Sequence, residues 1–185
     1  MTNFKSFKIL LSAGIVAITS SAAFAMNPEV GGAPMFAEKN IVENAVNSKD
    51  HTTLVAAVKA AGLVETLMSP GPFTVFAPVN AGFEKLPEGT VESLLKPENK
   101  EMLTKVLTSH VVAGKLSGAD LMKMASDNGG STMLETVSGD MVTAMVKDGA
   151  VILTDESGGM SMVTIADVNQ SNGVIHVIEN VLLPK

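Results

Sequence analysis

The chain of 185 residues contains no cysteine, no tryptophan, no tyrosine and no arginine. Without cysteine no disulfide can form, so packing alone must stabilise the fold, even in a compartment that permits disulfides. Positive charge is also scarce, since 13 lysines stand against 19 acidic residues and the formal net charge is −6. This balance argues against a nucleic-acid partner, which would need a basic face, and against binding to anionic lipid.

The scarcity of large anchor residues limits the kind of recognition to expect. Tryptophan, tyrosine and arginine dominate the energetic hot spots of protein interfaces, and the chain has none of them. We therefore expect weak contacts that multivalency strengthens, or a shallow apolar patch of methionine, leucine and valine. Candidate partners for such contacts are a surface protein, a matrix component or a polysaccharide.

Residues 1–25 are typical of a secretory leader. Two lysines precede an apolar run over residues 9–18, and Ala23 and Ala25 are small residues at the positions that a signal peptidase reads. The run has about half the length needed to cross a bilayer, so it does not predict a membrane anchor. We expect cleavage after Ala25, a periplasmic or extracellular location, and no membrane insertion of the mature chain.

The remaining chain predicts one domain preceded by a short arm. Residues 26–37 are rich in glycine and proline and show no periodicity, which indicates a flexible segment. Residues 38–185 are numerous enough to form a single domain with its own core. No internal repeat divides this region.

Helical patterns collect in the first half of the domain and strand patterns in the second half. Asn80 is placed to cap the short helical turn that follows it. Asp148-Gly149 and Asn172-Gly173 each favour the two-residue turn of a β-hairpin. The segment after Asn172-Gly173 is apolar on both faces, so we expect it to be a central strand of the sheet. This order predicts an α+β fold.

Three segments resemble the motifs of the fasciclin domain family, in the family's order. Residues 74–87 (TVFAPVNAGFEKLP) and 172–184 (NGVIHVIENVLLP) are similar to its two signature segments, and residues 107–116 (LTSHVVAGKL) are similar to its central motif. The resemblance covers nearly all of the chain from about Ile41. It implies a fasciclin-type β-sandwich of about seven strands wedged against several α-helices. It also implies a role in cell adhesion or matrix contact.

The central motif departs from the family pattern at a position that bears on function. A Tyr-His pair in animal members is associated with integrin contact, and the tyrosine position holds Ser109 here. Integrin binding is therefore not carried over, although Ser109 and His110 stay candidate contact residues. The apolar neighbours of His110 and His176 favour hydrogen-bonded structural roles, so His176 is assigned with Asn80 as a structural residue of the motifs. His51, beside the start of a predicted helix, is expected at the surface.

No residue pattern is typical of a catalytic, cofactor or metal site. Residues 93–96 match S-x-x-K and residues 126–128 match S-D-N, two motifs of penicillin-binding enzymes, but the third motif, K-T-G, is absent. The three histidines are too scattered for a zinc site. We therefore expect a non-enzymatic adhesion or surface-contact module without a cofactor. The alternative is a periplasmic carrier of a small apolar ligand, held in a cleft between helices and sheet.

Methionine is the unusual component, with 12 residues. Met122 and Met124 form one Met-x-Met pair, and Met160 and Met162 form a second. Thioethers are soft ligands that suit Cu(I), so methionine-based copper binding is a further alternative. Methionine also fills irregular cores, and alternate residues of a strand share a face in any case.

Overall fold

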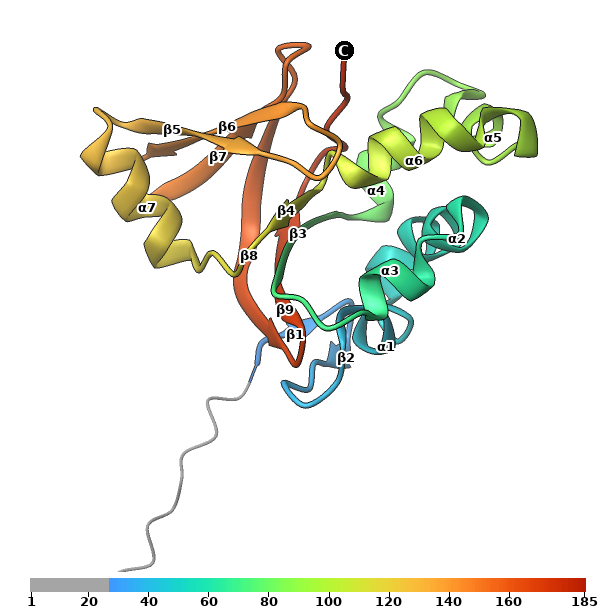
Figure 1. Cartoon of the computed structure of the whole chain (residues 1–185), viewed down its shortest axis with the longest axis horizontal. Helices are drawn as coiled ribbons and strands as arrows, with labels where there is room; N and C mark the ends of the chain where they lie inside the picture. Colours follow the sequence, from blue (N-terminus) through green and yellow to red (C-terminus); the bar gives the residue numbers. More distant parts are fainter. Residues whose placement is uncertain (1–26) are drawn as a thin grey trace, which may run out of the picture.

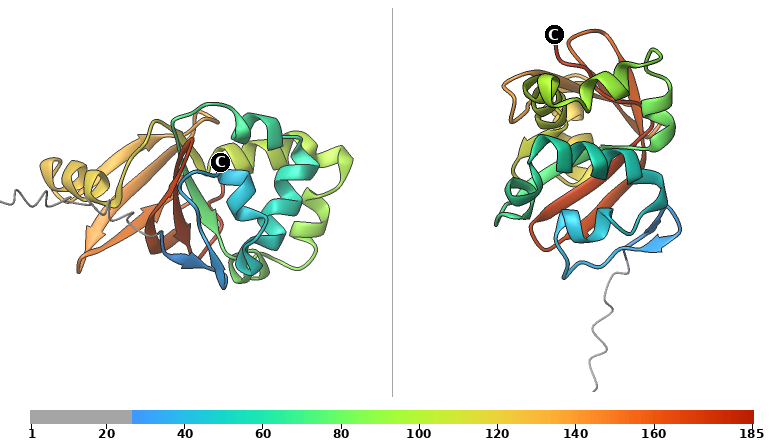
Figure 2. Two further views of the ribbon diagram at one scale, coloured as in Figure 1. Left: turned by 90° about the horizontal axis from the view of Figure 1, so that it is seen from below. Right: turned by 90° about the vertical axis from the view of Figure 1, so that its right-hand side faces the viewer.

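The computed structural model describes residues 27–185, so the leader expected over residues 1–25 lies outside the described residues. Helices pack beside a strongly curved sheet (Figures 1 and 2). The helices are α1 (Ile41–Ala45), α2 (Thr52–Ala61), α3 (Val64–Met68), α4 (Asn80–Glu84), α5 (Thr90–Leu94), α6 (Lys100–Thr108) and α7 (Gly118–Asp127). The strands are β1 (Glu29–Val30), β2 (Ala33–Pro34), β3 (Phe73–Pro78), β4 (Val111–Ala113), β5 (Ser131–Glu135), β6 (Met141–Lys147), β7 (Ala150–Thr154), β8 (Met160–Gln170) and β9 (Gly173–Ile178).

Seven strands form one sheet in the order β4-β3-β9-β8-β7-β6-β5. All neighbours are antiparallel except β3 and β9, which run parallel. The two edge strands of the sheet, β4 and β5, approach each other. Val112 of β4 forms an isolated bridge with Thr136, which follows β5. The backbone N–H of Val137 also donates to the carbonyl of Val111 at 2.8 Å. The predicted α+β class with about seven strands is confirmed, and the sheet is nearly closed.

The two predicted hairpins are present, one with its turn at the expected residues and one shifted. Asp148 and Gly149 form the first turn with φ values of 52° and 80°, as the type I′ geometry requires. In the second hairpin Gln170 pairs with Gly173, so Ser171 and Asn172 form the turn. Gly173 is instead the first residue of β9, where a Cβ would collide with the carbonyl oxygen of Phe73.

The central position predicted for the last strand is confirmed. β9 lies between β3 and β8, and every one of its residues is buried. Its apolar side chains supply two separate cores on its two faces. Val177 and Ile175 face the helices, whereas Ile178 faces the interior of the curved sheet.

The sheet interior is the first of these cores. It is built from Phe76, Val112, Leu134, Val142, Ala144, Val151, Leu153, Ile178 and Leu182, and from Leu121 of α7. α7 covers the open side of the curve, with Leu121 and Ala125 buried. Ser117 and Asp120 begin this helix with a capping box, in which each side chain satisfies a free backbone donor of the first turn.

The second core lies between the other helices and the opposite face of β3 and β9. It includes Leu54 and Val58 of α2 and Leu103 and Leu107 of α6. The right-hand view of Figure 2 shows these helices stacked over the sheet.

The segment expected as a flexible arm is instead ordered, which corrects that expectation. Glu29–Val30 and Ala33–Pro34 pair as a small antiparallel hairpin. Val30 and Met35 are buried in the helix-side core at 3% and 6% exposure. Asn27 adds hydrogen bonds to the backbone of Asn169 in both directions. The burial of these two side chains holds the segment against the domain. The sequence did not predict this, because the segment has no periodic apolar pattern.

Candidate functional site

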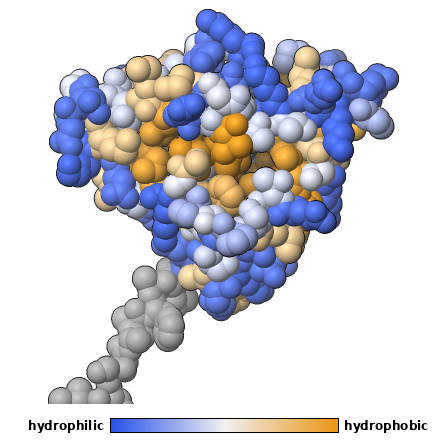
Figure 3. Space-filling model, in the orientation of Figure 1, coloured by the Kyte–Doolittle hydropathy of each residue, from blue (hydrophilic) through white to orange (hydrophobic). Residues whose placement is uncertain are grey.

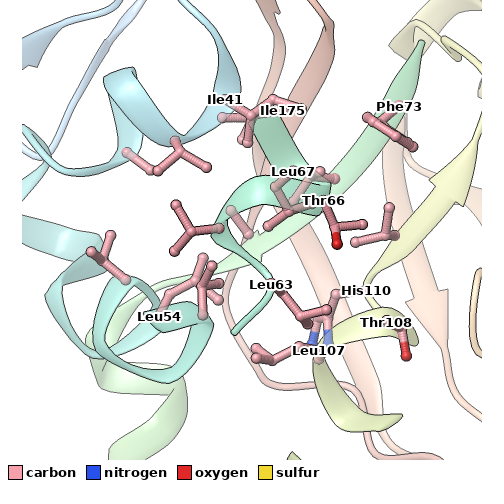
Figure 4. A pocket seen from close by; sticks show the side chains of 18 of the residues that line it. Ile41, Leu54, Leu63, Thr66, Leu67, Phe73, Leu107, Thr108, His110 and Ile175 are labelled. Carbon is pink, nitrogen blue, oxygen red and sulfur yellow. The ribbon is translucent and has the colours of Figure 1, made fainter. Parts of the chain in front are cut away.

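An apolar groove lies between α1, α2 and α3, the end of α6, and the strands β3 and β4. Figure 3 shows hydrophobic residues gathered in a hollow on this face, with hydrophilic residues around it. The cavity measures about 70 Å³. Figure 4 shows the lining side chains converging from the helices and from the sheet. They include Ile41, Leu54, Leu63, Leu67, Phe73 and Ile175.

The lining offers almost only aliphatic and aromatic carbon. The side chains with polar atoms among its residues are Lys59, Thr66, Thr108 and His110. Thr108 donates its hydroxyl to the carbonyl of Thr104 at 2.7 Å. A groove with this surface can bind an apolar side chain or small molecule by burial of carbon surface. It offers no nucleophile with an adjacent base.

His110 lies at one wall of the groove, where both ring nitrogens are engaged within the protein. Nδ1 donates to the carbonyl of Val106 at 2.7 Å, and Nε2 accepts from the backbone N–H of Leu182 at 2.9 Å. These contacts require a neutral ring. Burial lowers the pKa of His110 to about 4, although the hydrogen bond to Val106 and the charge of Asp155 act in the opposite direction. His110 therefore ties α6 to the C-terminal segment.

Ser109 also points into the protein. Its side chain donates to the carbonyl of Val106 at 2.7 Å, and the residue is 2% exposed. His110 has the same exposure. The candidate contact residues Ser109 and His110 are therefore both buried, and of the two only His110 lines the groove. Both side chains donate to the carbonyl of Val106 in the last turn of α6, and His110 also accepts from the N–H of Leu182.

His176 has the structural environment expected from its apolar neighbours. It is fully buried, and Nε2 donates to the carbonyl of Leu116 at 2.8 Å. Nδ1 accepts from the backbone N–H of Asp167 at 3.3 Å. The ring stacks against Phe76 with 5.7 Å between the centroids. Burial lowers the pKa of His176 below its ordinary value.

Asn80 is structural, but it does not cap the turn that follows it. It is the first residue of α4, and no side chain caps that helix. Its Oδ1 accepts from the backbone N–H of Thr53 at 3.0 Å, and its Nδ2 donates to the carbonyl of Lys49 at 2.8 Å. The side chain thus satisfies the first turn of α2, a helix from a distant part of the sequence. The prediction that Asn80 caps its own helix is therefore wrong, because its side chain binds the start of α2 and not the start of α4.

His51 is buried at 3% exposure, so the expectation of a surface position is wrong. Its Nδ1 contacts the hydroxyl of Ser48 at 2.9 Å, and its Nε2 donates to the carbonyl of Ala77 at 3.4 Å. Burial lowers the pKa of His51. All three histidines of the chain therefore join segments through their ring nitrogens.

Asn172 is a central residue that sequence reasoning assigned only to a turn. Its Oδ1 accepts from the backbone N–H of Ile41, and its Nδ2 donates to the carbonyls of Leu67 and Ser69 at 2.7 and 3.0 Å. One buried amide therefore satisfies the start of α1 and the end of α3. In the sequence, Asn172 was marked only by its place in the second signature segment. That place gives no information on which distant backbone groups the side chain binds.

Two features are absent from the part of the chain that the structure describes. Within residues 27–185, no group of three or more histidine, aspartate or glutamate side chains is arranged to hold a metal ion. No helix in the same range combines the length and the apolar character that a membrane span needs. The groove is thus the most distinctive concave feature of the described domain.

Comparisons with known proteins agree with this architecture. The chain is 46% identical to protein sll1483 of Synechocystis over 188 residues, which covers 94% of the chain and 97% of the relative. It is 34% identical to the immunogenic protein MPB70 of Mycobacterium bovis, over 76% of the chain and 66% of that protein.

A solved structure of a FAS1 domain pair, from the insect cell adhesion molecule fasciclin I, has a similar fold. It matches with a TM-score of 0.70 and 20% identity, over 78% of this chain and 51% of that one. The family model of the fasciclin domain matches residues 49–184. The chain therefore belongs to the fasciclin domain family.

Proposed function

We propose that this protein is an exported, non-enzymatic adhesion or surface-contact module, whose groove receives an apolar side chain or segment of its partner. The observation that carries the proposal is the groove itself, a hollow of apolar side chains that reaches the surface (Figure 3). Family membership supports the adhesion role, since the similar insect protein is named as a cell adhesion molecule.

The chemistry of the surface favours weak individual contacts. The chain has no tryptophan, tyrosine or arginine, which are the residues that most often anchor tight interfaces. The exposed large apolar residues are mainly methionines, with valines at positions 46 and 137 and a phenylalanine at position 36. Many weak contacts become strong when several modules act together, so we propose a multivalent mode of attachment to a surface protein, a matrix component or a polysaccharide.

A carrier of a small apolar ligand is the second candidate, supported by the same carbon-rich lining. The volume of the cavity favours the contact role. Pockets for small molecules usually enclose about 300–1,000 Å³, whereas this cavity measures about 70 Å³. A shallow groove accommodates a protruding side chain better than an enclosed ligand.

Two matched variants test the groove. Val64 is half-buried at the start of α3 and lines the groove, whereas Val46 is exposed at the end of α1 and does not. A strain lacking the gene is complemented with wild type, Val64→Lys or Val46→Lys, and attachment to a surface is measured. We expect wild type and Val46→Lys to restore attachment and Val64→Lys to fail, because a charge in the groove opposes apolar contact.

The folded state of both variants is checked by thermal melting, so that a loss of attachment is not a loss of fold. Full attachment by folded Val64→Lys would overturn the groove as the contact site. Solvent extraction of the purified protein distinguishes the carrier role. If an apolar molecule is recovered in stoichiometric amount from wild type but not from Val64→Lys, the carrier role is supported and the adhesion role of the groove is rejected.

A further inference from the structure

The outer face of the sheet over β5 to β8 carries a group of exposed methionines. Side chains of a strand alternate between the two faces, and the inner positions here are filled by Val142, Ala144, Val151 and Leu153 of the sheet interior. The alternate positions therefore face solvent. Met145 is 37% exposed, Met160 is 63% exposed and Met162 is 39% exposed.

The strand register brings three of these methionines together. Met145 of β6 pairs with Ile152 of β7, and Ile152 pairs with Met162 of β8. Met145 and Met162 thus lie in one row, two strand spacings of about 4.8 Å apart. Met160 precedes Met162 by two residues on the same face, at about 6.7 Å. The α-carbons of Met145 and Met160 each lie within about 10 Å of that of Met162, and Ile152 lies between Met145 and Met162.

Methionine side chains can converge over such a span. Each has three rotatable bonds and carries its sulfur far from the backbone. The strands beneath them are fixed by continuous pairing between β6, β7 and β8. Flexible donors on a rigid base can close around an ion without distorting the sheet.

We propose that Met145, Met160 and Met162 form a three-thioether site for a soft monovalent metal ion, Cu(I). Thioether sulfur is a soft ligand that prefers Cu(I) to the hard cations bound by carboxylates. The chain contains no cysteine that would compete for the ion. The site lies on the outer face of the sheet and is separate from the groove on the helix side, so it is independent of the adhesion proposal.

The structure distinguishes this group from the other Met-x-Met pair of the sequence. Met122 and Met124 lie on α7, where residues two apart point in widely different directions. Met122 is 38% exposed, whereas Met124 packs against the sheet interior. These two sulfurs face different surroundings and cannot bind one ion together. The helix pair is therefore a natural control.

The test compares two double variants that each lose two sulfur atoms. Met160→Leu/Met162→Leu removes two donors of the site, and Met122→Leu/Met124→Leu removes the control pair while preserving apolar volume. Cu(I), kept reduced with ascorbate, is titrated against a chromophoric Cu(I) chelator as competitor. We expect one ion bound by wild type and by the control variant, and at least about tenfold weaker binding by the Met160/Met162 variant.

Ag(I) offers a second readout that locates the ion. In chloride-free buffer, Ag(I) is added to protein labelled with ¹³C at the methionine methyl groups. The resonances of Met145, Met160 and Met162 should shift together, and those of Met122 and Met124 should stay in place. The proposal is overturned if wild type binds no Cu(I), or if the two double variants bind equally well. It is also overturned if the shifts are spread over all exposed methionines.

Discussion

The two cores of the domain are both apolar, but one is sealed and the other is open. Inside the curved sheet, Phe76, Leu153 and Ile178 have no exposed surface. On the helix side, the layer contains α1 and α3, which have five residues each. Helices this short are not stable alone and depend on tertiary packing. Their packing leaves the groove between them and the sheet.

This difference suggests that the sheet interior stabilises the fold and that the helix side provides the surface for contact. A continuous ladder of strands with α7 over its open side can close around side chains completely. A layer of short helices joined by turns leaves the hollow that we propose as the contact site. We therefore expect substitutions in the sheet interior to act mainly on folding, and substitutions at the groove to act mainly on binding.

Removal of Asn180–Lys185 should have the largest effect and unfold the domain. The segment contributes Leu182 to the sheet interior and Val181 to the helix-side core. It also donates the N–H of Leu182 to His110. Circular dichroism melting measures the result, and deletion of Lys185 alone is the control. A cooperative transition within a few degrees of the intact protein's would show that this segment is peripheral, contrary to the comparison above.

A matched pair of leucines tests the two cores directly. Leu153→Ala in the sealed interior should lower the free energy of unfolding by about 2–5 kcal/mol, because it leaves a closed cavity. Leu63→Ala in the groove wall should cost about 1 kcal/mol, since this wall already borders open space. Denaturant unfolding of both variants measures the difference. Equal losses would mean that the groove region is as strongly packed as the sheet interior.

Acid should weaken the contact between the two cores through His110. Its pKa is about 4 in the folded protein, against an ordinary value of 6.5. The folded state therefore holds fewer protons than the unfolded state between these values. Its contribution to stability is complete above about pH 6.5 and falls as the pH is lowered towards 4, by up to about 3 kcal/mol.

Denaturant unfolding at a series of pH values measures this slope. His51 and His176 have pKa values lowered by burial as well, so they should add to the fall in the same direction. The variant His110→Gln lacks the titrating ring and should show a shallower slope. An unchanged slope in that variant would assign the acid sensitivity to other groups.

Asn80→Ala should have one of the smaller effects of this series, a loss of about 0.5–2 kcal/mol, in the same range as that of Leu63→Ala. The loss arises at the first turn of α2, because Thr53 N–H and the carbonyl of Lys49 lose their partner. Hydrogen exchange of the amide of Thr53 locates the change. Faster exchange confined to α4 instead would return Asn80 to the role of a local cap.

The features predicted correctly from the sequence are those that local chemistry determines. Asp148-Gly149 forms its turn because the two residues themselves tolerate positive φ. The continuous apolar run of β9 indicated a strand covered on both faces. His176 was assigned a structural role from its apolar neighbours, and its hydrogen bonds support that assignment. In each case the signal lies within a few residues.

The errors arise where a distant segment decides the role of a residue. Gly173 looked like part of a turn, but it is a glycine because β3 approaches it closely. Asn80 looked like a cap for its own helix, but its oxygen faces α2. His51 looked exposed, and the carbonyl of Ala77 is its partner. A cleft between helices and sheet was expected for the carrier alternative, but its lining residues could not be predicted, because they come from segments spread between Ile41 and Ile175.

The parallel pairing of β3 with β9 has a kinetic consequence. Phe73 pairs with Gly173 and Pro78 with Ile178, so partners in the middle of the sheet are separated by 100 residues of chain. Contacts between such distant segments slow folding, because the loop between them must close first. A growing chain therefore lacks the strand that joins its two cores until β9 has been synthesised. The sheet therefore cannot close before β9 is made, and this delay is compatible with the export that we propose.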